Sequence, residues 1–321
     1  MNARNARLEA QQVVGDRFDA RVLEPSPPAV LDDEWFADDP LAVEDVDGSK
    51  PVVSPVPSGD LLWDEWLGTR PEHATWAAAS WLGAHRRLPA PPPTLAETRL
   101  ALHRLAAYVV SPARRRVNGK LALRWTLGGF GTPFFGADEQ VRVEGARLVR
   151  QRGEAADAEA VTTLAAAAAL ALDGPPDVDW VGELDVPPVG DLDEKLPVDP
   201  ASAEFLGDWY GFAYSVLEEL RADRDSVEAS RVQLWPEHFD AAFDCLPADR
   251  RATFGASPGD AAVAEPYLYV LPWHLDDASS VLWNAKSFRG AILPIGDLIA
   301  VPDQRAAALH FFRERHAALR A

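Results

Sequence analysis

The 321 residues are 47% hydrophobic and 25% charged, which fits a globular chain with a sizeable core and excludes wholesale disorder. The net charge of −19 is concentrated, because residues 1–60 and residues 173–200 each carry −8 while the other 233 residues carry only −3. A body this close to neutral lacks the basic stripe that binds a nucleic acid duplex, so we expect no nucleic acid partner.

The chain is predicted to stay in the cytoplasm. Cys245 is the only cysteine, so no intramolecular disulfide can form and a reducing compartment is the default. The first residues lack the apolar core of a secretory signal. The longest apolar run, residues 164–172, has nine residues, whereas a membrane helix needs about 20. We therefore expect neither export by this route nor a membrane partner.

Residues 1–60 differ in composition from the rest. They are acidic, interrupted by prolines and without hydrophobic periodicity, which predicts a disordered tail. Such a tail could engage a basic protein partner. The α+β body is then expected over residues 61–321, beginning with an alanine-rich helix over 73–84.

In the first half of the body, Thr94-x-x-Glu97 has the pattern of a capping box and predicts a helix that ends before Pro112. Asn118-Gly119 predicts a turn, and the alternation that follows predicts a strand over 120–127.

Two short strands over 141–145 and 146–152 should then be joined at Glu144-Gly145, with a return to helix over 157–172. The acidic, proline-rich stretch 173–199 is predicted to be a linker.

The second half opens on the clearest helix of the chain. Asp199 fits an N-cap and Pro200 fits the first helical turn. Large apolar residues then repeat at intervals of four, three, four and four: Phe205, Trp209, Phe212, Val216 and Leu220. Three strands are expected at 230–243, 266–273 and 288–295, and a final helix at 303–319. The predicted fold class is α+β, with two helix–antiparallel-strands–helix halves, 61–172 and 200–321, packed together.

The stretch VQLWPEHFDAAFD, residues 232–244, contains the first candidate site. A helix from Pro236 would point His238 and Asp240 in different directions. A strand kinked at Pro236, which we favour, would place them on one face about 6–7 Å apart. An imidazole beside a carboxylate can act as a general base or supply metal ligands, and His274 is the best third group. The alternative is a partly buried histidine hydrogen-bonded to its neighbour.

The strand over 266–273 contributes an aromatic face. Its tyrosines suit a ligand that both stacks and accepts hydrogen bonds, and they suit a cross-strand aromatic cluster beneath a helix equally well. No G-x-x-x-x-G-K-[ST], H-E-x-x-H or C-x-x-C motif occurs in the chain, so we predict no metal site and no cofactor. The candidate site residues are Trp235, His238, Asp240, Tyr267, Tyr269, Trp273 and His274.

Three segments of the chain resemble one family. They are LWPEHFD at 234–240, FGASPGD at 254–260, and FRGAILPIGDLI at 288–299 before a final helix. They look like a family of uncharacterised bacterial proteins, common in actinomycetes, with paired tyrosines in one strand and another strand ending in Leu-Pro. The resemblance covers roughly 200–321 and more faintly 100–150. It implies a shared fold and no particular reaction.

Together these observations favour an α+β protein with a small-molecule pocket lined by the 230–243 and 266–273 strands. The alternative is a protein-interaction module that uses the acidic tail or linker. Catalysis with His238 as general base and Asp240 as its partner is a narrower form of the first hypothesis. Whether the chain is an enzyme is left open.

Overall fold

The computed structural model describes residues 87–126, 128–133, 135, 139–152, 155–181, 186–230, 232–275 and 281–321. The predicted tail over 1–60 and the predicted helix over 73–84 lie outside these residues.

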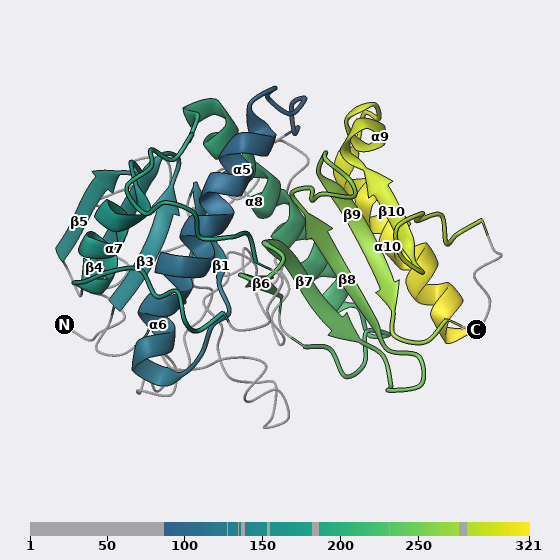
Figure 1. The fold of residues 1–321 in the computed structure, drawn as a ribbon. Helices are drawn as coiled ribbons and strands as arrows, with labels where there is room; N and C mark the ends of the chain where they lie inside the picture. The colour runs from purple at the N-terminus through teal and green to yellow at the C-terminus, as the bar shows by residue number, and fades with distance from the viewer. Residues whose placement is uncertain are drawn as a thin grey trace, which may run out of the picture.

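The predicted fold class is confirmed: each half is a helix, a five-stranded antiparallel sheet and a closing helix (Figure 1). The elements of the first half are α5 (Leu95–Leu105), η3 (Ala106–Val110), α6 (Ser111–Asn118), β1 (Arg124–Thr126), β2 (Gly129–Gly131), β3 (Glu139–Glu144), β4 (Arg147–Arg152), β5 (Ala155–Ala160) and α7 (Leu164–Leu172). Those of the second half are α8 (Pro200–Ala222), β6 (Gln233–Trp235), β7 (Asp240–Cys245), β8 (Ala252–Ser257), β9 (Tyr267–Pro272), β10 (Ala291–Pro294), α9 (Ile295–Ile299) and α10 (Gln304–Arg320).

The first helical segment is longer than predicted. The chain stays helical through the π-helical turn η3 and on through α6, and Pro112 occupies the first turn of α6. Pro112 cannot donate to the Tyr108 carbonyl one turn earlier, and that carbonyl accepts instead from the Asp177 amide at 3.0 Å. The predicted capping box is also wrong, because the Thr94 side chain caps nothing and bonds instead to Asp199 and Ser202 at 3.1 and 2.8 Å.

Several predicted boundaries need correction. The strand expected over 120–127 is reduced to β1, and the helix expected over 157–172 begins only at Leu164. Residues 155–160 form the edge strand β5 instead, although alanine and acidic residues are poor strand formers. Pairing with β4 holds this strand in place. β8 was not predicted at all.

Both sheets are meanders, in which each strand pairs with the next one in the chain. The first strands of the two sheets meet, because Leu123 beside β1 and Leu234 in β6 exchange two backbone hydrogen bonds of 2.8 Å. The two halves are thus joined edge to edge, with β5 and β10 at the outer ends.

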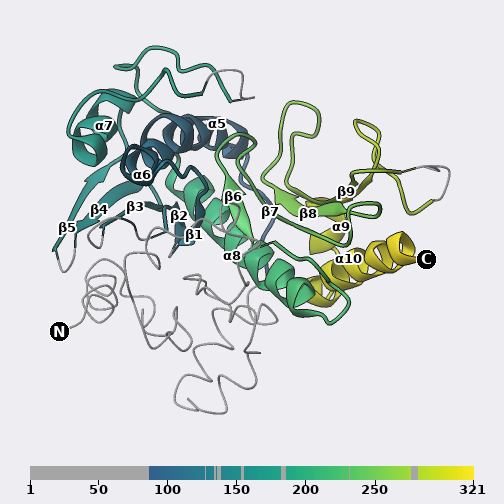
Figure 2. The same ribbon diagram turned by 90° about the horizontal axis from the view of Figure 1, so that it is seen from below.

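Helix α8 forms as predicted, with the Asp199 side chain accepting from the Ser202 amide at 2.9 Å. It packs against β1 and β2 of the first sheet and β7 and β8 of the second. Gly207 lets it approach β2 closely, and the Trp125 indole donates to the Gly207 carbonyl at 2.9 Å. Figure 2 shows α5, α6 and α7 on one side of the first sheet, with α8 and α10 on the opposite side of the second.

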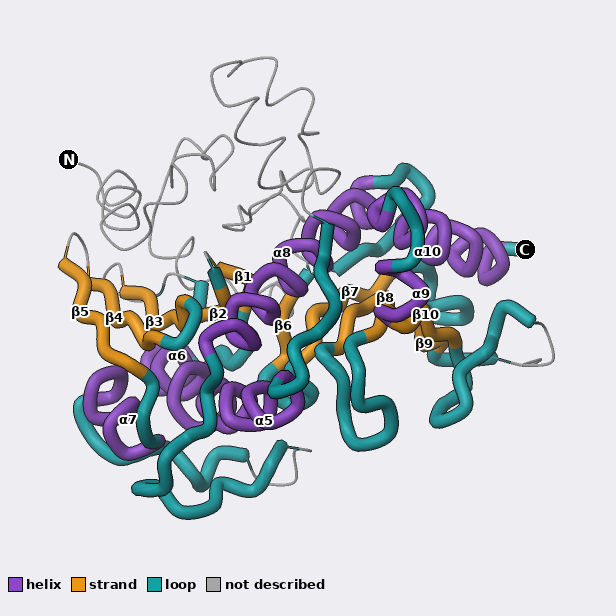
Figure 3. The backbone as a smooth tube through the Cα atoms, turned by 90° about the horizontal axis from the view of Figure 1, so that it is seen from above, coloured by secondary structure: helices purple, strands orange, loops and turns teal. Residues whose placement is uncertain are grey.

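Viewed from the other direction, α8 crosses from one sheet to the other (Figure 3). One hydrophobic cluster accordingly contains residues of both halves.

Part of the 173–199 segment packs against η3, where Trp180 donates to the Ala107 carbonyl at 2.9 Å and Tyr108 donates to the Pro187 carbonyl at 2.7 Å. Among the described helices, none has the length and apolar character to cross a membrane.

Candidate functional site

The segment expected to be one strand over 230–243 is a hairpin. β6 ends at Trp235, residues 236–239 form a turn, and β7 begins at Asp240, which pairs directly with Trp235. Phe239 reverses the chain with a φ of 56°, in the left-handed region that most side chains avoid. The strand prediction for residues 236–239 is therefore wrong, since Phe239 reaches the core from a turn.

The hairpin separates the two residues that the strand hypothesis placed side by side. His238 lies exposed in the turn, whereas Asp240 is buried in β7 with 6% of its surface exposed. Within the described residues no hydrogen bond joins their side chains. His238 still acts on Asp240 through its charge, but it does not share the buried environment of Asp240, which is therefore the residue to explain.

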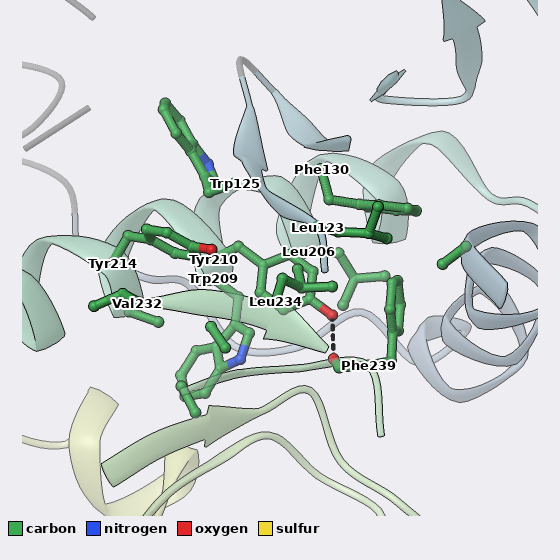
Figure 4. Packing of buried hydrophobic residues seen from close by; sticks show 14 of the residues in the cluster. Leu123, Trp125, Phe130, Leu206, Trp209, Tyr210, Tyr214, Val232, Leu234 and Phe239 are labelled. Atoms are coloured by element: carbon green, nitrogen blue, oxygen red, sulfur yellow. Dashed lines mark hydrogen bonds between the residues drawn. The ribbon is translucent and has the colours of Figure 1, made fainter. Parts of the chain in front are cut away.

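Two side chains distant in sequence hold the turn. His103 of α5 bonds through Nε2 to the carbonyls of Pro236 and Glu237 at 2.9 and 3.1 Å, and its ring stacks on Phe239 with centroids 5.1 Å apart. Burial lowers the pKa of His103 to about 4, so the ring is neutral at pH 7 and donates from Nε2. The Tyr210 hydroxyl donates to the Phe239 carbonyl at 2.6 Å (Figure 4). The left-handed conformation is fixed from both sides.

The second sheet has two chemically different faces, because side chains alternate along each strand. One face is apolar and packs on α8 and α10, where the rings of Phe254 and Phe312 lie 6.1 Å apart. The other, which we call the polar face, carries Trp235, Asp240, Asp244, Thr253, Gly255, Ser257, Tyr267 and Tyr269. The predicted aromatic face of β9 belongs to it.

Asp240 and Tyr269 form the centre of the polar face. Tyr269 on β9 reaches across β8 and donates its hydroxyl hydrogen to Oδ2 of Asp240 on β7. The ring lies over Gly255, where a Cβ would stand 2.4 Å from the Tyr269 Cζ. Only glycine leaves room for this crossing. Gly255 therefore makes a contact between non-adjacent strands sterically possible.

The Asp240 carboxyl is under-bonded. Its Oδ1 atom is buried and accepts no hydrogen bond from the described residues. Burial raises the pKa of Asp240, although the Tyr269 hydroxyl and the nearby His238 act in the opposite direction. An acceptor left without a partner inside a protein costs about 1–3 kcal/mol. Such a group calls for a partner that the described part of the chain does not supply.

A second phenol–carboxylate pair borders the first. Tyr267 donates to Oδ2 of Asp260, while Oδ1 of Asp260 accepts from the amides of Ala262 and Val263 at 2.6 and 2.7 Å. Arg99 of α5 ties the same loop down, since its Nη1 atom donates to the Ala264 carbonyl at 2.9 Å. Tyr267, Tyr269, Trp235, Asp240 and Asp260 are called the Asp240 site below.

Trp273 and His274 lie apart from this site. They are the first and second residues after β9, which ends at Pro272, and both are exposed. Trp273, with 53% of its surface exposed, stacks on the Arg251 guanidinium at 5.2 Å. The predicted third group for His238 and Asp240 is thus not supplied by His274. Among the described residues, no three histidine, cysteine or acidic side chains gather as a metal would require.

Sequence reasoning missed Arg99, His103, Tyr210 and Gly255, which build the site without being conspicuous. A glycine inside a strand pattern indicates a close approach by another group, and FGASPGD carried that signal at Gly255. Nothing in the local sequence marks the other three, because their partners lie far away in the chain.

Comparison with known proteins gives no assignment. No family model matches the chain, and neither do the curated proteins or the solved structures that were searched. The resemblance of residues 200–321 to a bacterial family therefore stays a prediction. The function has to be argued from the Asp240 site itself.

Proposed function

We propose that this protein binds a small molecule at the Asp240 site. The observation that carries the proposal is the buried Oδ1 atom of Asp240, which has no hydrogen-bond partner among the described residues. The surrounding residues hold this atom in position at a cost, through a left-handed Phe239 and a glycine at 255. Strained and under-bonded groups of this kind are typical of functional sites.

The half-buried residues at the margin of the site support the same function. Trp235, directly opposite Asp240, and Tyr269 are both partly exposed, so a molecule could reach the carboxyl along their rings. Aromatic side chains with a few convergent polar groups are the usual lining of small-molecule sites. A cytoplasmic location, expected from the single Cys245, is part of this proposal.

A fragment screen on the full-length chain tests the proposal. Saturation-transfer NMR should detect small fragments that bind the wild type and bind Asp240→Asn at least tenfold more weakly. Asp244→Asn is the matched control, because Asp244 lies on the same strand and face but its Oδ1 already accepts from Thr253 at 2.6 Å. Fragments that bind all three proteins equally would refute the site.

The acidic segment 1–60 supports a second function, that of a protein-interaction module. Its charge of −8 in 60 residues is the observation in its favour, because it could attract a basic partner. Deletion of residues 1–60 should then reduce recovery of that partner in co-purification. Unchanged recovery would leave small-molecule binding as the better-supported function.

A further inference from the structure

Three hydrogen-bond donors at the Asp240 site, two tyrosine hydroxyls and the Arg99 guanidinium, are already committed to groups of the chain. The hydroxyl hydrogen of Tyr269 points to Asp240, and that of Tyr267 points to Asp260. The Nη1 atom of Arg99 donates to the carbonyls of Pro258 and Ala264 at 3.4 and 2.9 Å. The Trp235 indole N–H is then the remaining donor that the five residues of the site offer to a ligand.

The acceptors, in contrast, are still available. Oδ1 of Asp240 accepts nothing from the described residues, and the Tyr269 oxygen keeps its lone pairs while the hydroxyl donates. The aromatic rings add electron-rich faces: Tyr267 and Tyr269 have centroids 6.1 Å apart, and Phe288 meets Tyr269 edge-on at 6.4 Å. Carboxylate oxygens and aromatic faces are the two partners that an organic cation prefers.

The charges around Asp240 favour a cation as well. Glu237 in the turn and Asp260 in the neighbouring loop are acidic. The basic groups are His238, which is exposed, and Arg99, whose charge faces Asp260. The other titratable groups that face Asp240 are tyrosines, which are neutral at pH 7: Tyr210, Tyr214, Tyr267 and Tyr269.

We propose that the ligand of the Asp240 site is a small organic cation, whose ammonium group donates a hydrogen bond to Oδ1 of Asp240 while its carbon skeleton lies against the aromatic rings. This inference rests on the proposed function and names its ligand class. It follows from the direction of the hydrogen bonds, since a site that offers acceptors selects a donor. An anion would place its charge against the buried Asp240 carboxyl and near the acidic Glu237.

Three probes of nearly equal size and shape separate the ligand classes: benzylamine, benzyl alcohol and benzoate. Each is titrated against the full-length chain at pH 7 and followed by saturation-transfer NMR. Benzylamine should bind at least tenfold more tightly than benzyl alcohol, and benzoate should not bind. Asp240→Asn should remove the preference for benzylamine, whereas Asp244→Asn should keep it.

The outcomes distinguish the two proposals. Binding of benzyl alcohol or benzoate as tight as that of benzylamine, lost in Asp240→Asn, would overturn the cation while leaving the site in place. Absence of binding by all three probes would overturn the site together with its ligand. If Asp240→Asn fails to fold, Tyr269→Phe replaces it: this change removes one hydroxyl, keeps the ring and should weaken benzylamine binding severalfold.

Discussion

Gly255→Ala tests whether the crossing of Tyr269 over β8 is as tight as the structure shows. A Cβ at position 255 would lie 2.4 Å from Cζ, 2.5 Å from Oη and 2.6 Å from Cε1 of the Tyr269 ring. All three distances are too short for contacts between such atoms. The ring must therefore move off β8, and its hydroxyl must leave the Asp240 carboxyl, because one shift causes the other.

The expected cost has two parts. Overpacking a well-filled contact costs about 1–3 kcal/mol. Loss of the hydrogen bond to a buried carboxyl, which then has neither oxygen satisfied, costs roughly another 1–3 kcal/mol. Gly255→Ala should accordingly lower the free energy of unfolding by about 2–6 kcal/mol, measured by urea denaturation at pH 7.

A double-mutant cycle isolates the cause. In a Tyr269→Ala background the ring is gone, so Gly255→Ala should be neutral, or stabilising by up to about 1 kcal/mol, because alanine loses less backbone entropy than glycine in a strand. The reasoning is refuted if Gly255→Ala costs the same in both backgrounds, with a coupling energy below about 0.5 kcal/mol.

Three further predictions concern residues that build the fold. His103 has a pKa of about 4 in the folded chain and 6.5 in the unfolded chain, so the unfolded state binds more protons between pH 4 and pH 6.5. The free energy of unfolding should therefore fall by at most about 3 kcal/mol as the pH drops from about 6.5 to 4, measured by urea denaturation. His103→Gln should abolish this pH dependence. Gly207→Ala should lower the free energy of unfolding by about 1–3 kcal/mol in the same assay, because a Cβ would lie 2.6 Å from the Gly128 backbone. Gly296→Ala is the control: Gly296 is helical, a Cβ there would meet open space, and the change should stabilise by about 1 kcal/mol. Equal effects of the two changes would contradict the close approach of α8 to β2. Burial raises the pKa of Asp240, so the contribution of this group to stability is lost as the pH rises through that pKa. Asp240→Asn should therefore be at least as stable as the wild type in thermal unfolding at pH 8. A large loss of stability would instead mark the carboxylate as structural.

The sequence predicted best those elements whose signals are local. Helix α8 forms where the Asp199-Pro200 start and the apolar spacing indicated, and α10 matches the predicted final helix within a residue. The N-cap, the first-turn proline and the 3.6-residue period all act within a few turns of chain. Such signals do not depend on the rest of the molecule.

The failures involve residues whose partners lie far away in the chain. Phe239 continues the aromatic alternation of its neighbours, yet it lies in a turn because His103 and Tyr210 hold the turn in place. The two carbonyls that His103 binds lie 133 and 134 residues away from it in the sequence. Similarly, Thr94 gives its hydroxyl to a contact 105 residues away and leaves the predicted cap unmade. Tertiary contacts override local preference at both places.

The candidate site was half predicted for the same reason. Tyr267 and Tyr269 share a face, as the alternation along β9 predicted. Trp235 and Asp240, which alternation along one strand would place on opposite faces, share a face because the hairpin turn pairs them. His238 stays exposed in the turn and His274 follows the end of β9, and neither position could be located from the local pattern. The link between Asp240 and Tyr269 depends on sheet order, which the sequence did not reveal.

The course of α8 has a consequence for how the molecule can be taken apart. One end of this helix covers β1 and β2, and the other covers β7 and β8. If the chain were cut before Pro200, the amino-terminal fragment would lose the helix that covers β1 and β2. The carboxy-terminal fragment would expose the apolar surface of α8 that normally packs against the first sheet. Neither fragment should be viable alone, whereas the two mixed together should reassemble, and heating the intact protein should melt both sheets in one step.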